Sequence, residues 1–170
     1  MNDLPNQPTP LLQAVRAMQM ICASLVMGVL FAAAVILTMP HNQIGQPNEA
    51  LQIIGYAFGA MALAMSPLLG GVIKHSTAKQ ALANGDATTL DLAAAYQTGM
   101  IVSLALNEGA AFFNLIAYWI AGSSPWNLAL VGLLTLGNAW KFPTLSRVTD
   151  WIDTVQRRLK DEADLDRNDQ

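Results

Sequence analysis

The chain has 170 residues, of which 53% are hydrophobic and 12% are charged, and its formal net charge is −3. The charged fraction is about half of the ~25% found in soluble domains, so the composition indicates a single-domain membrane protein that contacts the lipid bilayer and binds no nucleic acid. One cysteine, Cys22, excludes an intrachain disulfide, and two histidines are too few for a Cys/His metal site, so neither a metal nor a cofactor is expected.

The N-terminal part is predicted to be a tail followed by a first membrane span. Residues 1–11 contain three prolines among polar residues and no apolar periodicity, which indicates a disordered tail. A span follows at about 15–37, with Arg16 at its start. The apolar run from about Met18 to Met39 is longer than the roughly 7–15 residues of a signal-peptide core, so we interpret it as a retained span.

A second span is predicted at about 49–73, with Asn48 as its N-cap. Gly55 and Gly59 form a GxxxG motif, which lets the backbones of membrane helices approach closely. Two interpretations of the motif stay open, a homodimer contact and ordinary helix packing within the chain.

The second and third helices are expected to extend beyond the membrane as a hairpin over 74–95. The Asn-Gly-Asp sequence at 84–86 is typical of a helix end and a turn. Thr88 and Asp91 have the spacing of a capping box, with Asp in place of the usual Glu. The third helix would therefore begin at this point and cross the membrane at 96–120.

A fourth span is predicted at about 125–142, where Ser124 would be the N-cap and Pro125 the first helical residue. Residues 143–160 then have the pattern of an amphipathic helix, which we expect to lie against the inner leaflet or the 74–95 hairpin. Residues 161–170 are predicted to be a polar, frayed tail. The apolar residues of the amphipathic helix recur at helical spacing: Leu145, Val148, Ile152, Val155 and Leu159.

These elements predict an all-α fold, an integral membrane four-helix bundle at 12–142 with a C-terminal amphipathic helix. The basic residues give its orientation, because the loops at about 39–48 and 121–124 contain none of the nine Lys and Arg residues. The positive-inside rule therefore places both termini and the 74–95 hairpin in the cytoplasm. We expect a multi-pass protein of the cell membrane, and of a bacterial inner membrane in particular.

The third span carries the polar residues that attract a functional interpretation. Glu108 lies twelve residues after Tyr96, or about 18 Å along a helix, which places it near the centre of a ~30 Å hydrocarbon core. A carboxyl at that depth is a functional-site hypothesis by default. At about 100° per residue, the other polar residues lie close to it on one broad face. That face, expected to point into the protein or an oligomer, carries Gln97, Ser103, Asn107 and Asn114, with Gly109 as a small packing residue.

Three roles for Glu108 stay open. No Lys, Arg or His lies at the same depth on the other predicted spans, so burial without a counter-charge favours the neutral acid, which can donate one hydrogen bond. The neutral acid could hydrogen-bond helices together, it could handle protons or cations, or it could bind a lipid or small molecule. The sequence favours the first role.

Residues 104–120, with their small residues, mid-membrane acid and following aromatic and aliphatic residues, resemble the carboxylate helix of the rotary-ATPase proteolipid (c) subunits. This resemblance implies that Glu108 carries a proton or sodium ion. The acid lies on the third of four spans here, whereas four-span proteolipids place it on the last. The Leu-x-Glu-Gly-Ala-Ala sequence at 106–111 is also similar to that of small four-span bacterial membrane proteins of unassigned function, a resemblance that we prefer and that implies no activity.

No nucleotide-binding, metalloprotease or nucleophile-elbow motif is present in the sequence. We therefore expect a small non-catalytic membrane protein with a structural or accessory role, which could form a homo-oligomer. The alternative is a proton- or cation-coupled transport or channel element that uses Glu108.

Overall fold

The computed structural model describes residues 9–39, 48–83 and 87–168, and the side chains of 159–168 are not described. The described residues form five α-helices and no strand, which confirms the all-α fold class. The predicted turn at 84–86, the loop at 40–47 and residues 1–8 of the predicted tail lie outside the described residues. The helices are α1 (Pro10–Thr38), α2 (Glu49–Ala83), α3 (Thr89–Ile120), α4 (Pro125–Trp140) and α5 (Leu145–Asn168).

Two helix boundaries differ from the predicted ones by more than two residues, the start of α1 and the end of α5. Helix α1 begins at Pro10, inside the predicted tail, because proline fits the first helical turn, where its missing N–H needs no partner. Helix α5 continues to Asn168 through the predicted polar tail. That tail contains neither glycine nor proline, so no residue in it breaks a helix that has already begun.

The helix caps follow the sequence closely. Thr88 and Asp91 form the predicted capping box, in which the Thr88 hydroxyl accepts from the Asp91 N–H and the Asp91 carboxylate accepts from the Thr88 N–H at 2.9 Å. The side chain of Asn48 accepts from the Leu51 N–H at 3.1 Å, as expected of an N-cap. Ser124 precedes Pro125 as predicted, but its hydroxyl pairs with another helix instead of capping α4.

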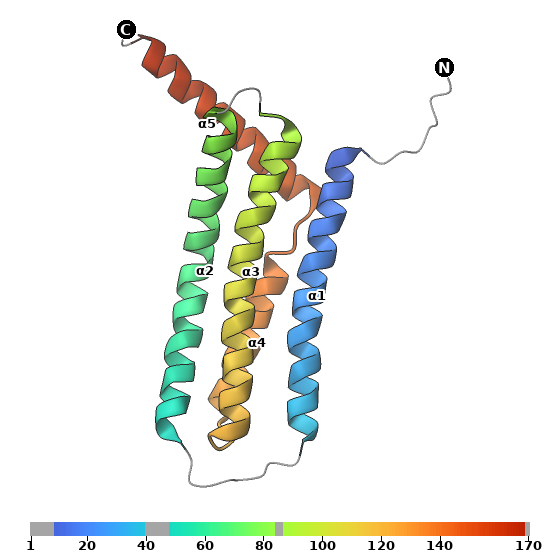
Figure 1. Cartoon of the computed structure of the whole chain (residues 1–170), viewed down its shortest axis with the longest axis vertical. Helices are drawn as coiled ribbons and strands as arrows, with labels where there is room; N and C mark the ends of the chain where they lie inside the picture. Colours follow the sequence, from blue (N-terminus) through green and yellow to red (C-terminus); the bar gives the residue numbers. More distant parts are fainter. Residues whose placement is uncertain (1–8, 40–47, 84–86, 169–170) are drawn as a thin grey trace, which may run out of the picture.

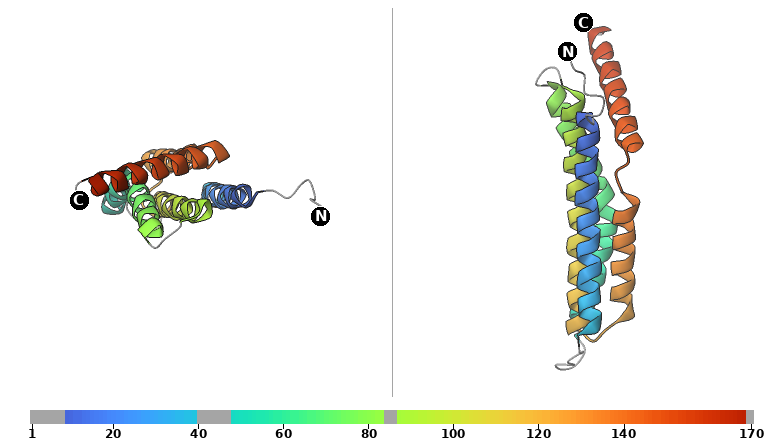
Figure 2. Two further views of the ribbon diagram at one scale, coloured as in Figure 1. Left: turned by 90° about the horizontal axis from the view of Figure 1, so that it is seen from above. Right: turned by 90° about the vertical axis from the view of Figure 1, so that its right-hand side faces the viewer.

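Helix α3 is the central helix of the molecule and contacts each of the other four. It lies between α1 and α2, and α4 packs behind it (Figure 1). Figure 2 shows the same layer of three helices from above, with α4 and α5 on one side of it. Helices α1 and α2 do not contact each other, and each packs against α3, so the bundle is organised around one central helix.

The contact between α2 and α3 is close because small residues line it. The buried residues of α2 are Gly55, Gly59, Ala62, Ser66, Gly70 and Ala78, and at about 100° per residue the first five lie on one side of the helix. The closest approach is between Gly70 and Gly99. An added Cβ at Gly70 would lie 2.9 Å from the Gly99 carbonyl oxygen and 2.9 Å from the Ser103 Cβ, and one at Gly99 would lie closer still to the Gly70 carbonyl oxygen. Such separations are possible only between glycine backbones.

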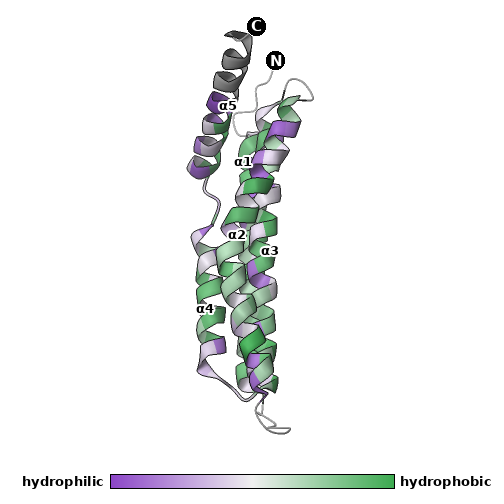
Figure 3. Ribbon diagram, turned by 90° about the vertical axis from the view of Figure 1, so that its left-hand side faces the viewer, coloured by the Kyte–Doolittle hydropathy of each residue, from purple (hydrophilic) through white to green (hydrophobic). Residues whose placement is uncertain are grey.

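Three helices, α1, α2 and α3, are long and apolar enough to cross a membrane. Their shafts are largely hydrophobic, whereas hydrophilic residues gather on α5 and near the helix ends (Figure 3). Helix α4 has 16 residues, which span about 24 Å at the standard rise, less than the ~30 Å of a hydrocarbon core.

The amphipathic helix α5 packs against the end of the bundle. Val148, Ile152 and Val155 are fully or almost fully buried and belong to one apolar cluster with Ala78 of α2 and Leu92 of α3. Helix α5 thus packs against residues of the 74–95 hairpin, one of its two predicted locations, and the inner leaflet stays a prediction. A second apolar cluster fills the other half of the bundle, around Val29, Ala62, Leu115, Val131 and Leu134.

Candidate functional site

The predicted polar face of α3 makes contacts with α2 and α4. The amide nitrogen of Asn107 donates to the Asn138 side-chain oxygen of α4 at 2.9 Å, and the Asn138 amide donates to the Leu104 carbonyl at 3.4 Å. Asn114 donates to the Gly55 carbonyl of α2 at 3.0 Å. Asn107, Asn114 and Asn138 are all buried, so these bonds lie inside the bundle.

Ser103, also buried, has a partner that the sequence did not predict. The Lys141 ammonium, just beyond α4, donates to the Ser103 hydroxyl at 2.7 Å and to the Ser66 hydroxyl of α2 at 2.8 Å. One cation therefore joins α2, α3 and the end of α4. Lys141 reaches this point because a lysine side chain can extend its ammonium well away from its own backbone.

Glu108 and Gln97 differ from the rest of the predicted face. Both are half-buried, and neither makes a hydrogen bond to the described part of the chain. Glu108 faces α1, where a Cβ added to Gly28 would lie 3.6 Å from its carboxyl oxygen. The carboxyl therefore lies at the edge of the α1–α3 contact without a bonded partner among the described residues.

The predicted packing glycines fall into two groups. Gly55 and Gly59 are buried against α3, where added Cβ atoms would lie 3.0 Å and 3.1 Å from the Asn114 side chain. The GxxxG motif is thus occupied within the chain and offers no free surface for a homodimer. Gly109 is exposed, and no described atom lies within 4 Å of an added Cβ.

Some buried polar atoms have no partner in the described structure. They include both side-chain polar atoms of Asn127 in the first turn of α4, a residue that the sequence analysis did not single out. The side-chain oxygens of Asn107 and Asn114 are also unpaired. Buried polar groups of this kind are normally bonded, whereas the Asn127 side chain makes no hydrogen bond to the described residues.

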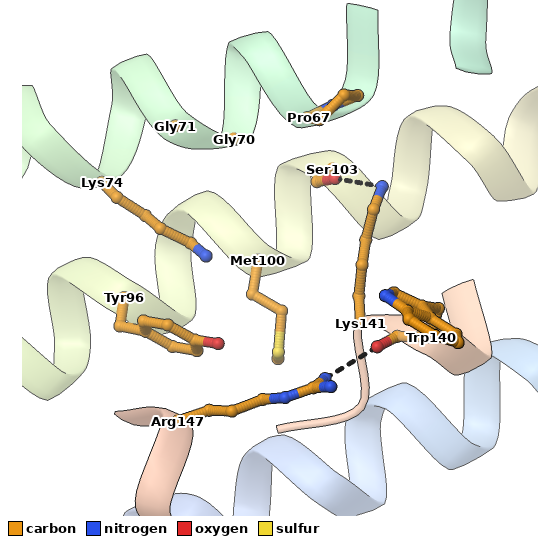
Figure 4. A pocket seen from close by; sticks show the side chains of 10 residues that line it. All are labelled: Pro67, Gly70, Gly71, Lys74, Tyr96, Met100, Ser103, Trp140, Lys141 and Arg147. Carbon is orange, nitrogen blue, oxygen red and sulfur yellow. Dashed lines mark hydrogen bonds between the residues drawn. The ribbon is translucent and has the colours of Figure 1, made fainter. Parts of the chain in front are cut away.

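A cavity of about 270 Å³ lies next to the bonded Lys141 and is lined by three basic side chains from three different elements. Figure 4 shows Lys74 of α2, Lys141 after α4 and Arg147 of α5 around it, with Met100 and Tyr96 between them. No acidic side chain lines it among the described residues. In the sequence, these basic residues served only to predict the orientation in the membrane. The one indication that they could lie close together was their position near the ends of three predicted helices.

Neutral groups hold the three cations. The Lys74 ammonium lies 3.9 Å from the centroid of the Tyr96 ring, a cation–π contact. The Arg147 guanidinium donates to the Trp140 carbonyl at 2.7 Å and to the Phe142 carbonyl at 3.3 Å. None of these partners carries a negative charge, so the positive charges around the cavity are not neutralised by the described residues.

Comparisons of this chain with protein-family models, with curated proteins and with solved structures find no match. The functional interpretation therefore comes from the residues and their contacts.

Proposed function

We propose that this chain is a four-span, non-catalytic membrane protein with a structural or accessory role, with both termini in the cytoplasm of a bacterial cell. Support for the fourth span comes from Lys141. Lys141 lies seventeen residues after Ser124, and Ile120 lies seventeen residues after Ser103, so the two antiparallel segments have the same length. The Lys141 ammonium contacts Ser103 at the end of this length. Helix α4 and its lysine thus cover about 25 Å of α3, most of the ~30 Å thickness of a hydrocarbon core.

The orientation predicts which positions an impermeant thiol reagent can reach. In a Cys22→Ser background, we expect Ser123→Cys to be labelled from outside intact cells, whereas Lys79→Cys and Asp153→Cys need permeabilised cells. Ser123 lies at one end of the bundle, and Lys79 and Asp153, which are both exposed, lie at the other. Labelling of Lys79→Cys in intact cells would show that the orientation is wrong.

The interhelical hydrogen bonds of Asn107 and Asn114 are the observation that carries the structural role. These side chains lie at membrane depth, where polar groups join helices, and they bond α3 to α4 and to α2. Asn107 and Asn114, two polar residues of the predicted face, are therefore occupied in holding helices together, whereas Glu108 is not. A homo-oligomer, if formed, would use the exposed face of α3 around Gly109.

A double-mutant cycle tests this role for Asn107 and Asn138. We expect Asn107→Leu and Asn138→Leu to be coupled by about 0.6 kcal/mol, and by no more than about 1.7 kcal/mol, in the free energy of unfolding in detergent, the average and the maximum measured for such bonds in membranes. Asn127→Leu is the control, because Asn127 is buried without a partner, and it should be neutral or stabilising. Additive effects of the two Leu substitutions would contradict the proposed role.

The second candidate function is proton- or cation-coupled transport through Glu108. One observation favours it, namely that the half-buried carboxyl faces Gly28 of α1 and makes no hydrogen bond to the described residues. A carboxyl without a structural partner is free to exchange a proton. No second titratable side chain is placed beside it by any contact among the described residues, so we rank transport below the structural role.

A further inference from the structure

The cavity lined by Lys74, Lys141 and Arg147 has a feature that the proposed structural role does not use, an excess of positive charge. A structural lysine inside a protein is normally paired with a carboxylate. Here the cations are positioned by two serine hydroxyls, an aromatic ring and backbone carbonyls. Lys74 and Lys141 also repel each other. An anion in the cavity would remove this repulsion.

Donor groups remain available for such an anion. The Lys141 ammonium has three N–H donors and uses two of them on Ser66 and Ser103. The Lys74 ammonium makes a cation–π contact with the Tyr96 ring and donates no hydrogen bond to the described residues. Arg147 makes both of its bonds through one terminal nitrogen, which leaves donors on the other nitrogens of its fork.

The donor set fits a phosphate group, which both lysine and arginine bind. Lysine binds phosphate as a point charge and arginine binds it through a fork of N–H groups. A volume of about 270 Å³ is near the lower end of the range for small-molecule sites. The cavity can therefore hold a phosphate and a small attached group.

The depth of the cavity points to the membrane boundary. Pro67 and Lys74, the first and last residues of α2 that line the cavity, lie eighteen and twenty-five residues after Glu49, or about 27 Å and 37 Å along α2. A hydrocarbon core is ~30 Å thick, with headgroups on either side of it, so the cavity extends from the core edge into the headgroup region. Trp140, which is 80% exposed, lines the cavity as well, and tryptophan is enriched at this boundary.

We propose that the cavity among Lys74, Lys141 and Arg147 binds the phosphate group of an anionic ligand, either a phospholipid headgroup or a soluble phosphate ester. The three side chains supply the charge, Ser66 and Ser103 hold Lys141 in place, and Tyr96 holds Lys74. This site does not include Glu108 or the asparagine contacts, so a test of phosphate binding is separate from a test of the proposed structural role.

The test uses the full-length protein in an uncharged, phosphate-free maltoside detergent. One arm measures retained phosphatidylglycerol by native mass spectrometry, and the other measures binding of glycerol 3-phosphate by calorimetry. We expect wild type to bind in one of the two arms, and the arm that responds identifies the source of the phosphate. Lys74→Gln and Lys141→Gln should each weaken that binding at least about tenfold, which corresponds to about 1.4 kcal/mol.

Lys79→Gln is the matched control, because Lys79 is an exposed lysine on the same helix and does not line the cavity. It should change the affinity less than about twofold. Lys74→Arg and Lys141→Arg keep the charge and should retain most of the binding, which guards against misfolding of the Gln variants. Absence of binding by wild type in both arms, or equal weakening by Lys79→Gln, would overturn the proposal.

Discussion

Gly70→Leu is expected to destabilise the bundle more than any other single substitution at a glycine of α2. An added Cβ at Gly70 would meet the Gly99 carbonyl oxygen and the Ser103 Cβ, both at 2.9 Å. A backbone oxygen cannot move aside as a flexible side chain can, so α2 and α3 would have to separate along their whole contact. Overpacking typically costs 1–3 kcal/mol, and we expect about 3 kcal/mol or more here.

Gly71→Leu is the matched control for this prediction. Gly71 is the next residue of the same helix, and no described atom lies within 4 Å of an added Cβ. Its replacement should leave stability unchanged or raise it by up to about 1 kcal/mol, because leucine is a better helix former than glycine. Unfolding of both variants in a mixed denaturing detergent, followed by circular dichroism, gives the comparison. Equal effects at the two positions would show that α2 and α3 do not approach as described.

Ile152→Asp is expected to release α5 from the end of the bundle. Ile152 is 3% exposed and packs in the cluster that contains Ala78 and Leu92. Truncating a buried isoleucine costs about 2–5 kcal/mol, and burying an unpaired carboxylate adds to this. Few other contacts hold α5, so the docked helix should become the minor state.

Limited proteolysis measures this release, because Arg157 and Arg158 on α5 are exposed trypsin sites that become cleavable when the helix opens locally. Thr154→Asp adds the same charge at an exposed position of α5 and should leave cleavage at the wild-type rate. The Trp151 fluorescence should change only in Ile152→Asp, since Trp151 packs edge-on to Tyr96 at 5.4 Å. Unchanged cleavage of Ile152→Asp would mean that α5 is not held by this cluster.

Much of the fold could be predicted from local sequence because local rules determine it. The Thr88–Asp91 capping box and the Asn48 cap depend on residues three apart, and the length of α3 follows from its apolar composition. The inward position of Asn107 and Asn114 follows from helical periodicity alone. These features need no knowledge of how the helices are arranged.

The cavity could not be predicted because it depends on helix arrangement. Lys74 and Lys141 are 67 residues apart in the sequence. No local sequence pattern indicates that the Lys141 side chain, which follows the end of α4, would contact Ser66 and Ser103. Close approach at Gly70 also requires knowing which face of α2 meets Gly99 of α3. For the same reason the motif at Gly55 and Gly59 fits both interpretations in the sequence, and the neighbouring residues of other helices, Asn114 among them, distinguish the two.

Ion flux measures most directly whether the polar face of α3 is structural or carries ions. Proteoliposomes of wild type and of Glu108→Gln would be compared with protein-free vesicles by a pH-sensitive dye, at both signs of an imposed potential and with sodium or potassium outside. Gln keeps the size of the side chain but cannot ionise, so the variant should fold. We expect all three preparations to have the same flux. Flux through wild type that Glu108→Gln abolishes would contradict the structural role and establish transport.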